Sequence, residues 1–482
     1  AHEHSTEAIP AILTGKEPDE VKLPVLADHP RNLFTLLPES YRFDVFESAT
    51  RLCPSERCPR REEPFLRRLR WLTSDVSDVY LQILLPDELA KRLPPVTQTW
   101  MNFGDEGESR RRADAVRYDA QIDVMVGHEF SKDQVLLFET FVSSVAPTRK
   151  PALHFLHVLL PHSPWQYLPS GARYPNGIAI DGLNIDSWRK DEWLATQGWQ
   201  RHLLQTMYAD RLLGRLLDRL RATDLYDRSL VVVLADHGVS FRPGERRRGA
   251  TRTNLHDIAF VPLFVKKPFQ REPRVEDEHV EAVDILPSLA DVLDLPVPAP
   301  LDGASFFSRA YAPDDEVRVY RRAGEPPVVR PFSSLLRGRH ATVAEQSALF
   351  GSGNERQLFE IGPHARALIG RRLEVLRVGR SSSLSAKLAG RGRLADVVLS
   401  SGVVPARLTG TLEGEGAHGG LALAVALNGR VAATTRSYED GDTVRFSALV
   451  PEAALRDGAN DIAVFRSARR GGALVLEPVP LG

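Results

Sequence analysis

The stretch that decides the fold runs from residue 198 to residue 238 and reads GWQRHLLQTMYADRLLGRLLDRLRATDLYDRSLVVVLADHG. Its first half places apolar residues at helical spacing over 200–221, which predicts one long amphipathic helix. Its second half contains a continuous apolar run, 229–235, as expected of a strand buried on both faces of a sheet. That strand delivers Asp236 and His237 at its carboxyl end.

Further short apolar runs predict strands on either side of this stretch, at 41–46, 154–160 and 261–265. Strand, long helix and strand at this spacing are typical of an α/β domain with helices on both faces of a mostly parallel central sheet. We expect this domain to cover residues 1–310.

The character of the sequence changes after about residue 340, where Pro- and Arg-rich segments give way to short alternating strands. The pair Asn428-Gly429, flanked by apolar alternation, is a strong signal for a type I′ hairpin turn. We therefore predict a connecting region over 311–394 and a small antiparallel β domain over 395–482, built as a sandwich.

Composition narrows the function. With 62 basic and 63 acidic residues the net charge is -1, which argues against a dedicated nucleic-acid binder. No window of about 18 consecutive apolar residues occurs. Two cysteines exclude a disulfide-rich scaffold and a cysteine zinc cluster. Cys53 and Cys58 stand five positions apart, and both a local disulfide and two free thiols remain open.

Asp236 and His237 are the first candidates for chemistry, because ligands of open α/β sheets bind at the carboxyl ends of the strands. A carboxylate with an imidazole suits Zn²⁺ or Mn²⁺ better than Mg²⁺ alone. Gly238 lets the backbone turn sharply and approach a ligand. For an isolated Asp-His-Gly tripeptide, a capping Asp and a buried structural His would be the better interpretation.

The surrounding motifs change that balance. The 198–238 stretch, with Tyr208 and Gly214 ahead of Asp-His-Gly, resembles the sulfatase and phosphoethanolamine–phosphoglycerol transferase branch of the alkaline phosphatase superfamily. The segments HVLLPHSPWQY (157–167), DIAFVPLFVKKP (257–268) and AVDILPSLADVLDLPVPAPLDGASF (282–306) resemble further elements of that family in the same order. The resemblance implies an alkaline-phosphatase-like α/β fold and a divalent metal, Zn or Mn first and Ca or Mg as alternatives.

The family's nucleophile sits at the start of a helix beside the metal, and the segment STEAIPAILTG places Ser5 there, with Thr6 as runner-up. A helix N-cap is the structural alternative and is compatible with a nucleophile. The sulfatase pattern also needs Pro at position 7 and Arg at position 9, where this chain has Glu7 and Ile9. That departure argues against a formylglycine and for an unmodified hydroxyl.

The resemblance implies roles for further residues. The ligand set nameable here is Asp236, His237 and Ser5, and a fourth, acidic ligand would come from an upstream strand that this sequence does not contain. His162 would donate to a non-bridging oxygen or act as general acid. A loop histidine held by the backbone is the alternative for His162. Asn254 and His256 are candidates for substrate contact, in a loop whose spacing varies within the family.

These observations predict a metal-dependent phosphoryl transferase or phosphoric-ester hydrolase with a covalent intermediate, acting on a membrane lipid or cell-envelope glycan. The alternatives are a sulfuric ester hydrolase and an inactive sulfatase-like binding module. We expect no nucleic-acid partner. The resemblance further implies a longer parent protein with an upstream membrane segment, at the extracytoplasmic face of the cell membrane.

Overall fold

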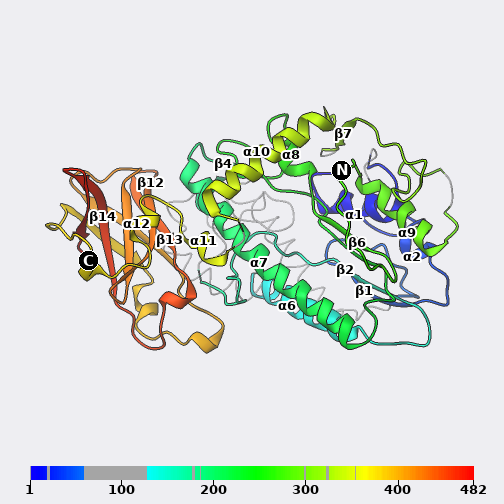
Figure 1. The fold of residues 1–482 in the computed structure, drawn as a ribbon, viewed down its shortest axis with the longest axis horizontal. Coiled ribbons are helices and arrows are strands. Elements are labelled where there is room, and N and C mark those ends of the chain that lie inside the picture. Colours follow the sequence, from blue (N-terminus) through cyan, green and yellow to red (C-terminus); the bar gives the residue numbers. More distant parts are fainter. Residues whose placement is uncertain are drawn as a thin grey trace, which may run out of the picture.

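The computed structural model describes residues 2–18, 22–58, 127–175, 180–184, 186–297, 300–321, 325–352 and 354–482, with 127–133 described by backbone alone. The molecule is elongated, with an α/β part that holds the N-terminus at one end and a β domain that holds the C-terminus at the other (Figure 1). None of the described helices is long and apolar enough to cross a membrane.

Helix α1 (Ser5–Thr14) opens the described chain and packs by its apolar face. It ends at Gly15, whose φ of 65° lies in the left-handed region that glycine adopts freely. Ile9 and Leu13 are buried in a core shared with α2 (Leu33–Leu36) and α9 (Ile285–Leu293). Cys53 and Cys58 lie in the same core and form a disulfide, which decides between the two alternatives left open by the sequence.

Two pairs of strands form the layer that these helices cover. β1 (Arg42–Phe46) and β2 (Ala152–Leu156) run parallel, with Arg42 opposite Ala152. β5 (Val231–Leu234) and β6 (Leu263–Lys266) run antiparallel, with Val231 opposite Lys266. All four predicted strands are confirmed, each within a few residues of its expected bounds. Parallel pairing, however, is seen in this layer only for β1 and β2 among the described strands.

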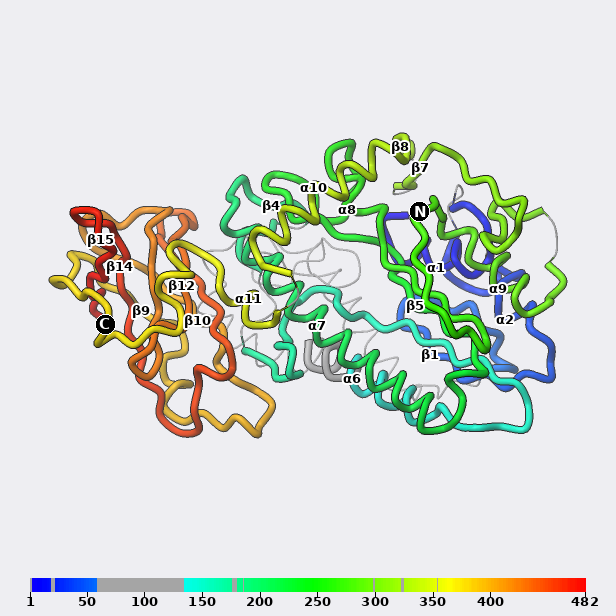
Figure 2. The backbone as a smooth tube through the Cα atoms, in the orientation of Figure 1, coloured from blue at the N-terminus to red at the C-terminus, as the bar shows by residue number. Residues whose placement is uncertain are grey.

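The opposite face of the layer is covered by α6 (Gly127–Ser144) and α7 (Glu192–Ala222), which lie side by side in Figures 1 and 2. The Asp191 side chain caps α7 by accepting from the N–H groups of Trp193 and Leu194. Phe46 of β1 meets Phe141 of α6 edge to face, with ring centroids 5.8 Å apart. Helices thus cover both faces of the strands, and the predicted α/β class is confirmed.

Short elements complete the α/β part and the connection to the β domain. They are β3 (Leu183–Asn184), β4 (Ser187–Trp188), α8 (Leu255–Ala259), η1 (Ala282–Asp284), β7 (Glu316–Val319), β8 (Val328–Pro331), α10 (Phe332–Phe350), α11 (Glu355–Phe359), α12 (Ala365–Leu368) and η2 (Leu373–Val375).

The C-terminal domain is one antiparallel sheet of seven strands in the order β15-β14-β11-β12-β13-β10-β9. The strands are β9 (Leu384–Ala389), β10 (Arg407–Gly414), β11 (Ala422–Leu427), β12 (Arg430–Asp440), β13 (Thr443–Leu449), β14 (Ile462–Arg470) and β15 (Ala473–Val479), with short 3₁₀ turns η3 (Arg391–Leu394), η4 (Leu399–Ser401) and η5 (Glu452–Ala454). Both Asn428 (φ 50°) and Gly429 (φ 75°) are left-handed, so the I′ hairpin is confirmed.

The sheet curls until its two edge strands meet, because Ala386 of β9 bridges to Leu481, just beyond β15. The β domain is therefore a single curled sheet that encloses an apolar core, and not the two-sheet sandwich that the sequence predicts. Its first strand begins at Leu384, while the division of the chain at residues 310 and 394 stays a prediction.

The β domain is joined to the α/β part by a continuous core. Trp199 and Leu204 of α7 are buried with Phe350 of α10 and with Val425 and Leu449 of the sheet. An ion pair crosses the same interface: the guanidinium of Arg407 contacts the carboxylate of Asp181 at 2.5 Å, and both side chains are nearly inaccessible. The two parts therefore pack as one body rather than as beads on a linker.

Candidate active site

The end of β5 places Asp236 and His237 as the sequence predicts. The His237 Nδ1 lies 2.9 Å from the carbonyl oxygen of Gly238, so it donates there and leaves Nε2 as the free lone pair. The Gly238 N–H donates to the carbonyl of Ile258 at 2.9 Å. A Cβ at Gly238 would lie 2.0 Å from the carbonyl oxygen of Asp257. Glycine is thus required for the strand end to pack against α8.

The Asp236 carboxylate is buried and charged. Burial alone would raise its pKa, but the nearby imidazole of His237, the Ser5 hydroxyl and His157 outweigh it, so the pKa of Asp236 lies below its usual value. Its Oδ2 is buried without a hydrogen-bond partner of ordinary geometry. A buried anionic oxygen left in this state points to a ligand or cation that the protein itself does not supply.

Helix α1 aims its N-terminus at this carboxylate. His4 occupies the N-cap position, and its side chain makes no capping hydrogen bond to the N–H groups of the first turn. The Ser5 hydroxyl donates a hydrogen bond toward the Asp236 carboxylate, which lowers the pKa of Asp236. The Thr6 hydroxyl instead donates to the carboxylate of Glu7 on its own helix. Of the two predicted nucleophiles, Ser5 is therefore the one that faces Asp236.

Two residues at the ends of β2 and β1 complete this side of the site. His157 follows β2, and burial lowers its pKa while Asp236 and Glu47 act against that shift. Its Nδ1 is buried without a hydrogen-bond partner. Glu47 follows β1 and accepts from the N–H of Leu52 at 2.7 Å and from the Thr50 hydroxyl at 2.7 Å. Glu47 therefore anchors the loop that follows β1.

The loop after β2 carries His162 and is held in place by α7. Gln205 donates to the His162 carbonyl at 2.7 Å and accepts from the Gln166 N–H at 2.9 Å. Burial, followed by the charges of Arg248 and Arg247, lowers the pKa of His162 to about 3. The ring is therefore neutral near pH 7.

Both ring nitrogens of His162 are engaged. Nδ1 lies 2.5 Å from the carbonyl oxygen of Ser163, and Nε2 lies 3.2 Å from Nη1 of Arg248. A neutral imidazole that donates through Nδ1 accepts at Nε2, so His162 receives a hydrogen bond from Arg248. In this arrangement the ring orients Arg248, while the predicted role of His162 as a hydrogen-bond donor or general acid stays a prediction.

Arg247 and Arg248 belong to the run ERRR (245–248), whose hydrophilic sequence is compatible with a solvated loop and with attraction of an anionic group. The side chain of Arg247 is only 6% exposed and that of Arg248 24%. Arg247 donates to the Ser163 hydroxyl at 2.7 Å. The carboxylate of Asp186 lies 3.5 Å from Arg247 and 3.8 Å from Arg248, so two cations share one anion. The local charge is positive, as a site for an anion requires.

Asn254 and His256 lie beside this loop, Asn254 through its contacts to Arg246 and Gly249 and His256 through its contact to Arg242. The Asn254 side chain is fully buried, donating to the carbonyls of Arg246 and Gly249 at 2.9 and 3.0 Å. It thereby shapes the loop that carries the arginines. His256 contacts Arg242 at 2.7 Å and lies under Gly338 of α10. Their predicted contact with substrate stays a prediction.

The donor chemistry fits one corner of a metal site and does not complete it. His237 Nε2 and Asp236 Oδ2 lie 3.9 Å apart, with the free lone pair and the unpartnered oxygen described above. Over the ranges that the structure describes, no three His, Cys, Asp or Glu residues are arranged to hold a metal ion. The predicted ligand roles of Asp236, His237 and Ser5 therefore stay a prediction.

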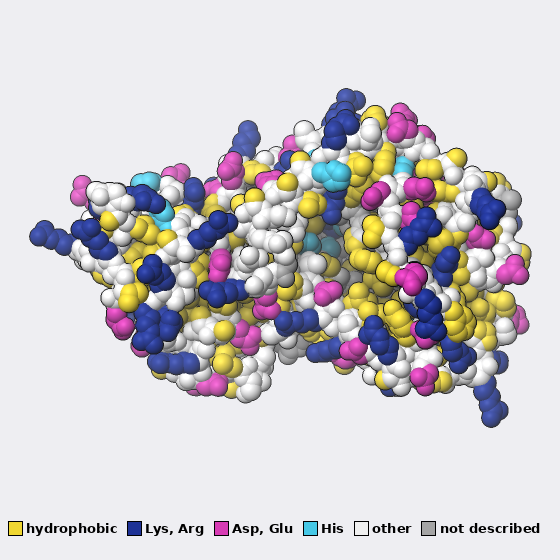
Figure 3. All heavy atoms as spheres, in the orientation of Figure 1, with side chains coloured by type: hydrophobic (Ala, Val, Ile, Leu, Met, Phe, Trp, Pro, Cys, Tyr) yellow, Lys and Arg dark blue, Asp and Glu magenta, His cyan; other side chains and the backbone are white. Residues whose placement is uncertain are grey.

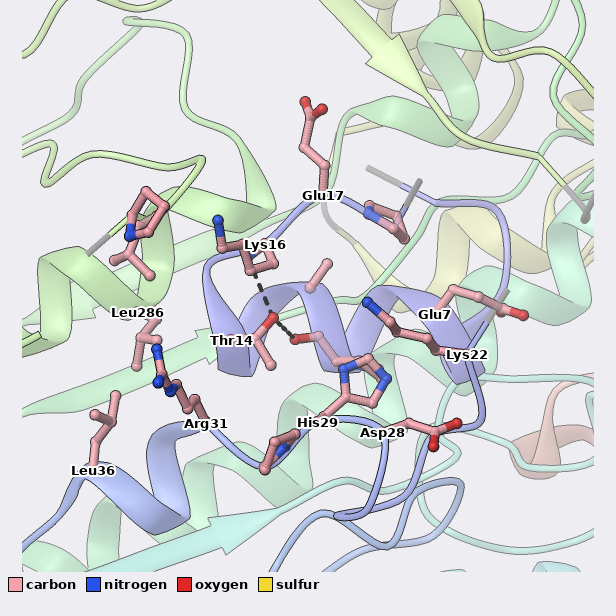
Figure 4. A pocket seen from close by; sticks show the side chains of 16 residues that line it. Glu7, Thr14, Lys16, Glu17, Lys22, Asp28, His29, Arg31, Leu36 and Leu286 are labelled. Carbon is pink, nitrogen blue, oxygen red and sulfur yellow. Dashed lines mark hydrogen bonds between the residues drawn. The ribbon is translucent and has the colours of Figure 1, made fainter. Parts of the chain in front are cut away.

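A separate pocket of about 260 Å³ lies along another face of α1 (Figure 4). Glu7, Pro10, Ala11 and Thr14 line it from the helix, and Figure 4 shows Lys22 and His29 close to the Glu7 end. These positions share the side of the helix away from Ser5. None of the residues assembled above lines this pocket, so it is distinct from the candidate active site.

Fold and site together define a class: an α/β enzyme domain with a hydroxyl, a strand-end Asp-His pair and a basic loop. The sulfatase family model matches residues 88–295, of which 88–126 lie outside the described residues. An endo-4-O-sulfatase of Bacteroides thetaiotaomicron is 23% identical over 239 residues, 47% of this chain and 45% of the relative. An arylsulfatase K of Gallus gallus is 30% identical over 98 residues, 20% of this chain and 18% of the relative.

A solved phosphonate monoester hydrolase from Silicibacter pomeroyi is 17% identical, with a TM-score of 0.38, covering 72% of this chain and 86% of its own. The chain matches less than half the length of each of the two curated relatives. The sulfatase family match confirms the resemblance to the sulfatase-like branch of the alkaline phosphatase superfamily. Over residues 88–295 the chain is therefore similar to the sulfatase family.

Proposed function

We propose that the chain hydrolyses an ester whose acid part is a tetrahedral oxyanion carried on a glycan. The proposal rests on one observation, the arrangement of residues around Ser5. The Ser5 hydroxyl lies at a helix N-terminus without a side-chain cap and interacts with Asp236. The Arg248–His162 pair belongs to the same site, because His162 interacts with both Arg248 and His237. A helix N-terminus and a guanidinium both stabilise negative charge on such a group.

The proposal gives a chemical role to each of the residues Ser5, Asp236, Arg248 and His162. Ser5 attacks the central atom, forming an O–S or O–P bond as the bond to the leaving alcohol oxygen breaks. Asp236 takes the Ser5 proton, and this proton passes through water to the departing alkoxide, which leaves as the alcohol. Arg248 donates to the non-bridging oxygens and is oriented by His162. Water then releases the acid from Ser5 and returns the hydroxyl. A divalent metal, Zn²⁺ or Mn²⁺ by donor type, would add Lewis-acid polarisation when held by Asp236, His237 and a further ligand.

Sulfate is the first candidate for the acid. The two relatives described above are named as sulfatases, one as an endo-4-O-sulfatase, which supports a sulfated glycan as substrate. Phosphate is the second candidate, and a specific observation favours it. Positions 7 and 9 hold Glu7 and Ile9 rather than the Pro and Arg of the formylglycine pattern, so the nucleophile would be the plain Ser5 hydroxyl. Phosphoryl transfer to a lipid or glycan acceptor belongs to this second candidate.

The place of action is also part of the proposal. Cys53 and Cys58 are joined in a disulfide, and disulfides persist in oxidising compartments. This supports an extracytoplasmic location, at a cell membrane or envelope where sulfated or phosphorylated glycans are exposed. Membrane attachment of a longer parent protein remains a proposal that rests on the family resemblance.

The test compares the full chain on an aryl sulfate, an aryl phosphate monoester and an aryl phosphate diester, each with added Zn²⁺ or Mn²⁺. Ser5→Ala should abolish turnover and Thr6→Ala should retain most of it, because the Thr6 hydroxyl is held by Glu7. Preference for the sulfate supports the first candidate and preference for a phosphate ester the second. Equal turnover by wild type and Ser5→Ala would refute the proposed nucleophile.

Inactivity on all three esters must be read with metal content. If the wild type binds a stoichiometric metal that Asp236→Ala loses, the ligand role of Asp236 is supported and a larger glycan ester becomes the next substrate. If the wild type is inactive and metal content is the same in Asp236→Ala, the inactive binding module replaces the enzyme.

A further inference from the structure

A second basic feature lies far from the candidate active site, on the C-terminal β domain. A groove of about 400 Å³ is lined by Arg377, Arg380, Arg466 and Arg470, together with Gly379, Ser381, Ser382, Ser383, Val475 and Glu477. Figure 3 shows basic side chains gathered over this end of the molecule. Four arginines face one glutamate, so the groove has three positive charges in excess.

The groove has a defined construction at the edge of the curled sheet. The segment around Val378 adds to β15 as a short parallel strand: the Gly379 N–H donates to the Leu476 carbonyl at 2.8 Å, and the Leu476 N–H donates to the Arg377 carbonyl at 2.9 Å. Antiparallel pairing places Arg466 of β14 opposite Glu477 of β15. Arginines from two segments distant in sequence are thereby brought to the same face.

Gly379 keeps the floor of the groove open. A Cβ at this position would lie 2.9 Å from Cγ1 of Val475 and 3.9 Å from Cγ of Glu477. The floor is therefore a small aliphatic surface flanked by guanidinium groups, with the Ser381 and Ser383 side chains at the surface. A sulfated sugar ring is chemically complementary to this lining. Its apolar face can pack on the aliphatic floor, its hydroxyls can bond to the serines, and its sulfate oxygens can accept from the arginines.

The arginines differ in how far they are already satisfied. Arg470 donates to the Glu477 carboxylate at 2.8 and 3.1 Å, and Arg466 lies 3.7 Å from it. Arg377 and Arg380 are exposed and form no ion pair with any described carboxylate. The guanidinium groups of Arg377 and Arg380 can therefore pair directly with an external anion. Those of Arg466 and Arg470 can do so once the anion replaces the Glu477 carboxylate that they share.

The excess of positive charge is confined to the C-terminal part of the chain, which includes the β domain and the segment just before it. Residues 371–482 hold 15 basic and 11 acidic residues, although the full chain is close to neutral, with a net charge of -1. A basic surface on an otherwise neutral protein concentrates a polyanionic ligand there.

We propose that this groove binds a sulfated polysaccharide chain, apart from the catalytic centre, and so anchors the protein to a polymer of the kind that bears its ester. The groove itself does not depend on the proposed chemistry, because its lining comes from the β domain and from the segment just before β9, away from the candidate active site. A sulfated glycan is favoured over a lipid surface because the cations line a concave groove with a polar rim of serines.

The test measures binding of dextran sulfate to the full chain by isothermal titration calorimetry, with unsulfated dextran of the same size as the control polymer. Arg377→Ser with Arg380→Ser should raise Kd about tenfold or more, since each removes a charge-assisted contact. The matched control removes the same charge elsewhere in the domain, by Arg391→Ser with Arg393→Ser, and should raise Kd less than about threefold. Glu477→Gln should lower Kd, because it frees Arg466 and Arg470.

Each other outcome would overturn the proposal. Equal losses in the two double variants would mean diffuse attraction by the domain charge. Equal binding of dextran and dextran sulfate would remove the role of sulfate. Binding to anionic phosphatidylglycerol vesicles without binding to dextran sulfate would replace the glycan by a membrane surface, and equally tight binding of single-stranded DNA would reduce the groove to a general polyanion site. Turnover of a small aryl ester by the groove variants reports on the active site separately.

Discussion

The packing of Gly238 against α8 gives the most demanding prediction for the candidate active site. A Cβ there would lie 2.0 Å from the Asp257 carbonyl oxygen and 3.0 Å from the Ile258 Cα, both backbone atoms that cannot rotate away. In Gly238→Ala the strand end and α8 must therefore separate by about 1 Å or more, since contacts under 3.0 Å are essentially never seen for a real Cβ. The Gly238–Ile258 hydrogen bond would lengthen as well.

That displacement falls on Asp236 and His237, which immediately precede the glycine. A misplacement of about 1 Å in a catalytic constellation can lower kcat/KM by about 10²-fold. Loss of packing and of one backbone hydrogen bond should also lower the free energy of unfolding by about 1–3 kcal/mol. The assay is turnover of the aryl ester that proves to be a substrate, with thermal unfolding measured on the same preparation.

Gly214 is the matched control within the same sequence stretch. It lies inside α7, and a Cβ there would meet nothing within 4 Å. Gly214→Ala should leave turnover unchanged and raise the free energy of unfolding by about 0.5–1 kcal/mol, because alanine is the better helix former. Activity of Gly238→Ala within about threefold of wild type would refute the argument that this contact positions the Asp-His pair.

Three further outcomes are expected. Burial holds the pKa of His162 at about 3 in the folded chain, so below about pH 6.5 only the unfolded chain takes up this proton. The free energy of unfolding should therefore decrease as the pH is lowered, by up to about 1.4 kcal/mol per pH unit. Denaturant unfolding at pH 7 and pH 5 should show a smaller decrease for His162→Gln than for wild type, and an equal decrease would contradict the burial of His162. Cys53→Ser with Cys58→Ser should lower the free energy of unfolding by about 2 kcal/mol without a reductant and have no effect relative to reduced wild type. Arg248→Met should lower kcat/KM for the ester about 10²-fold while thermal unfolding changes little, and unchanged kinetics would remove it from oxyanion binding.

Local sequence was sufficient for the features that a single segment encodes. The long helix, the apolar strand before Asp236 and the Asn428-Gly429 hairpin all follow from spacing or turn chemistry within a few residues. Strand direction was not accessible in this way. The apolar run of β6 is as compatible with parallel as with antiparallel pairing to β5, because burial on both faces fixes composition and not polarity.

The burial of Arg247 and Arg248 could not be predicted from the sequence. A run of Glu and three Arg is hydrophilic, and nothing adjacent to it indicates burial. Its burial depends on distant partners: Asp186 receives the Gly249 N–H at 3.2 Å, and the Glu3 carboxylate receives the Ala250 N–H at 2.7 Å. Glu3 directly precedes the α1 N-terminus, so one contact fixes the basic loop to the helix that carries Ser5.

This coupling gives the proposed nucleophile and the proposed oxyanion donor a common frame. Asn254 ties the loop from within through the carbonyls of Arg246 and Gly249, and Glu3 ties it to α1 from outside. Loss of the Asn254 amide would then disturb Arg248 through the loop that carries it. The predicted contact of Asn254 with substrate stays a prediction beside this positioning role.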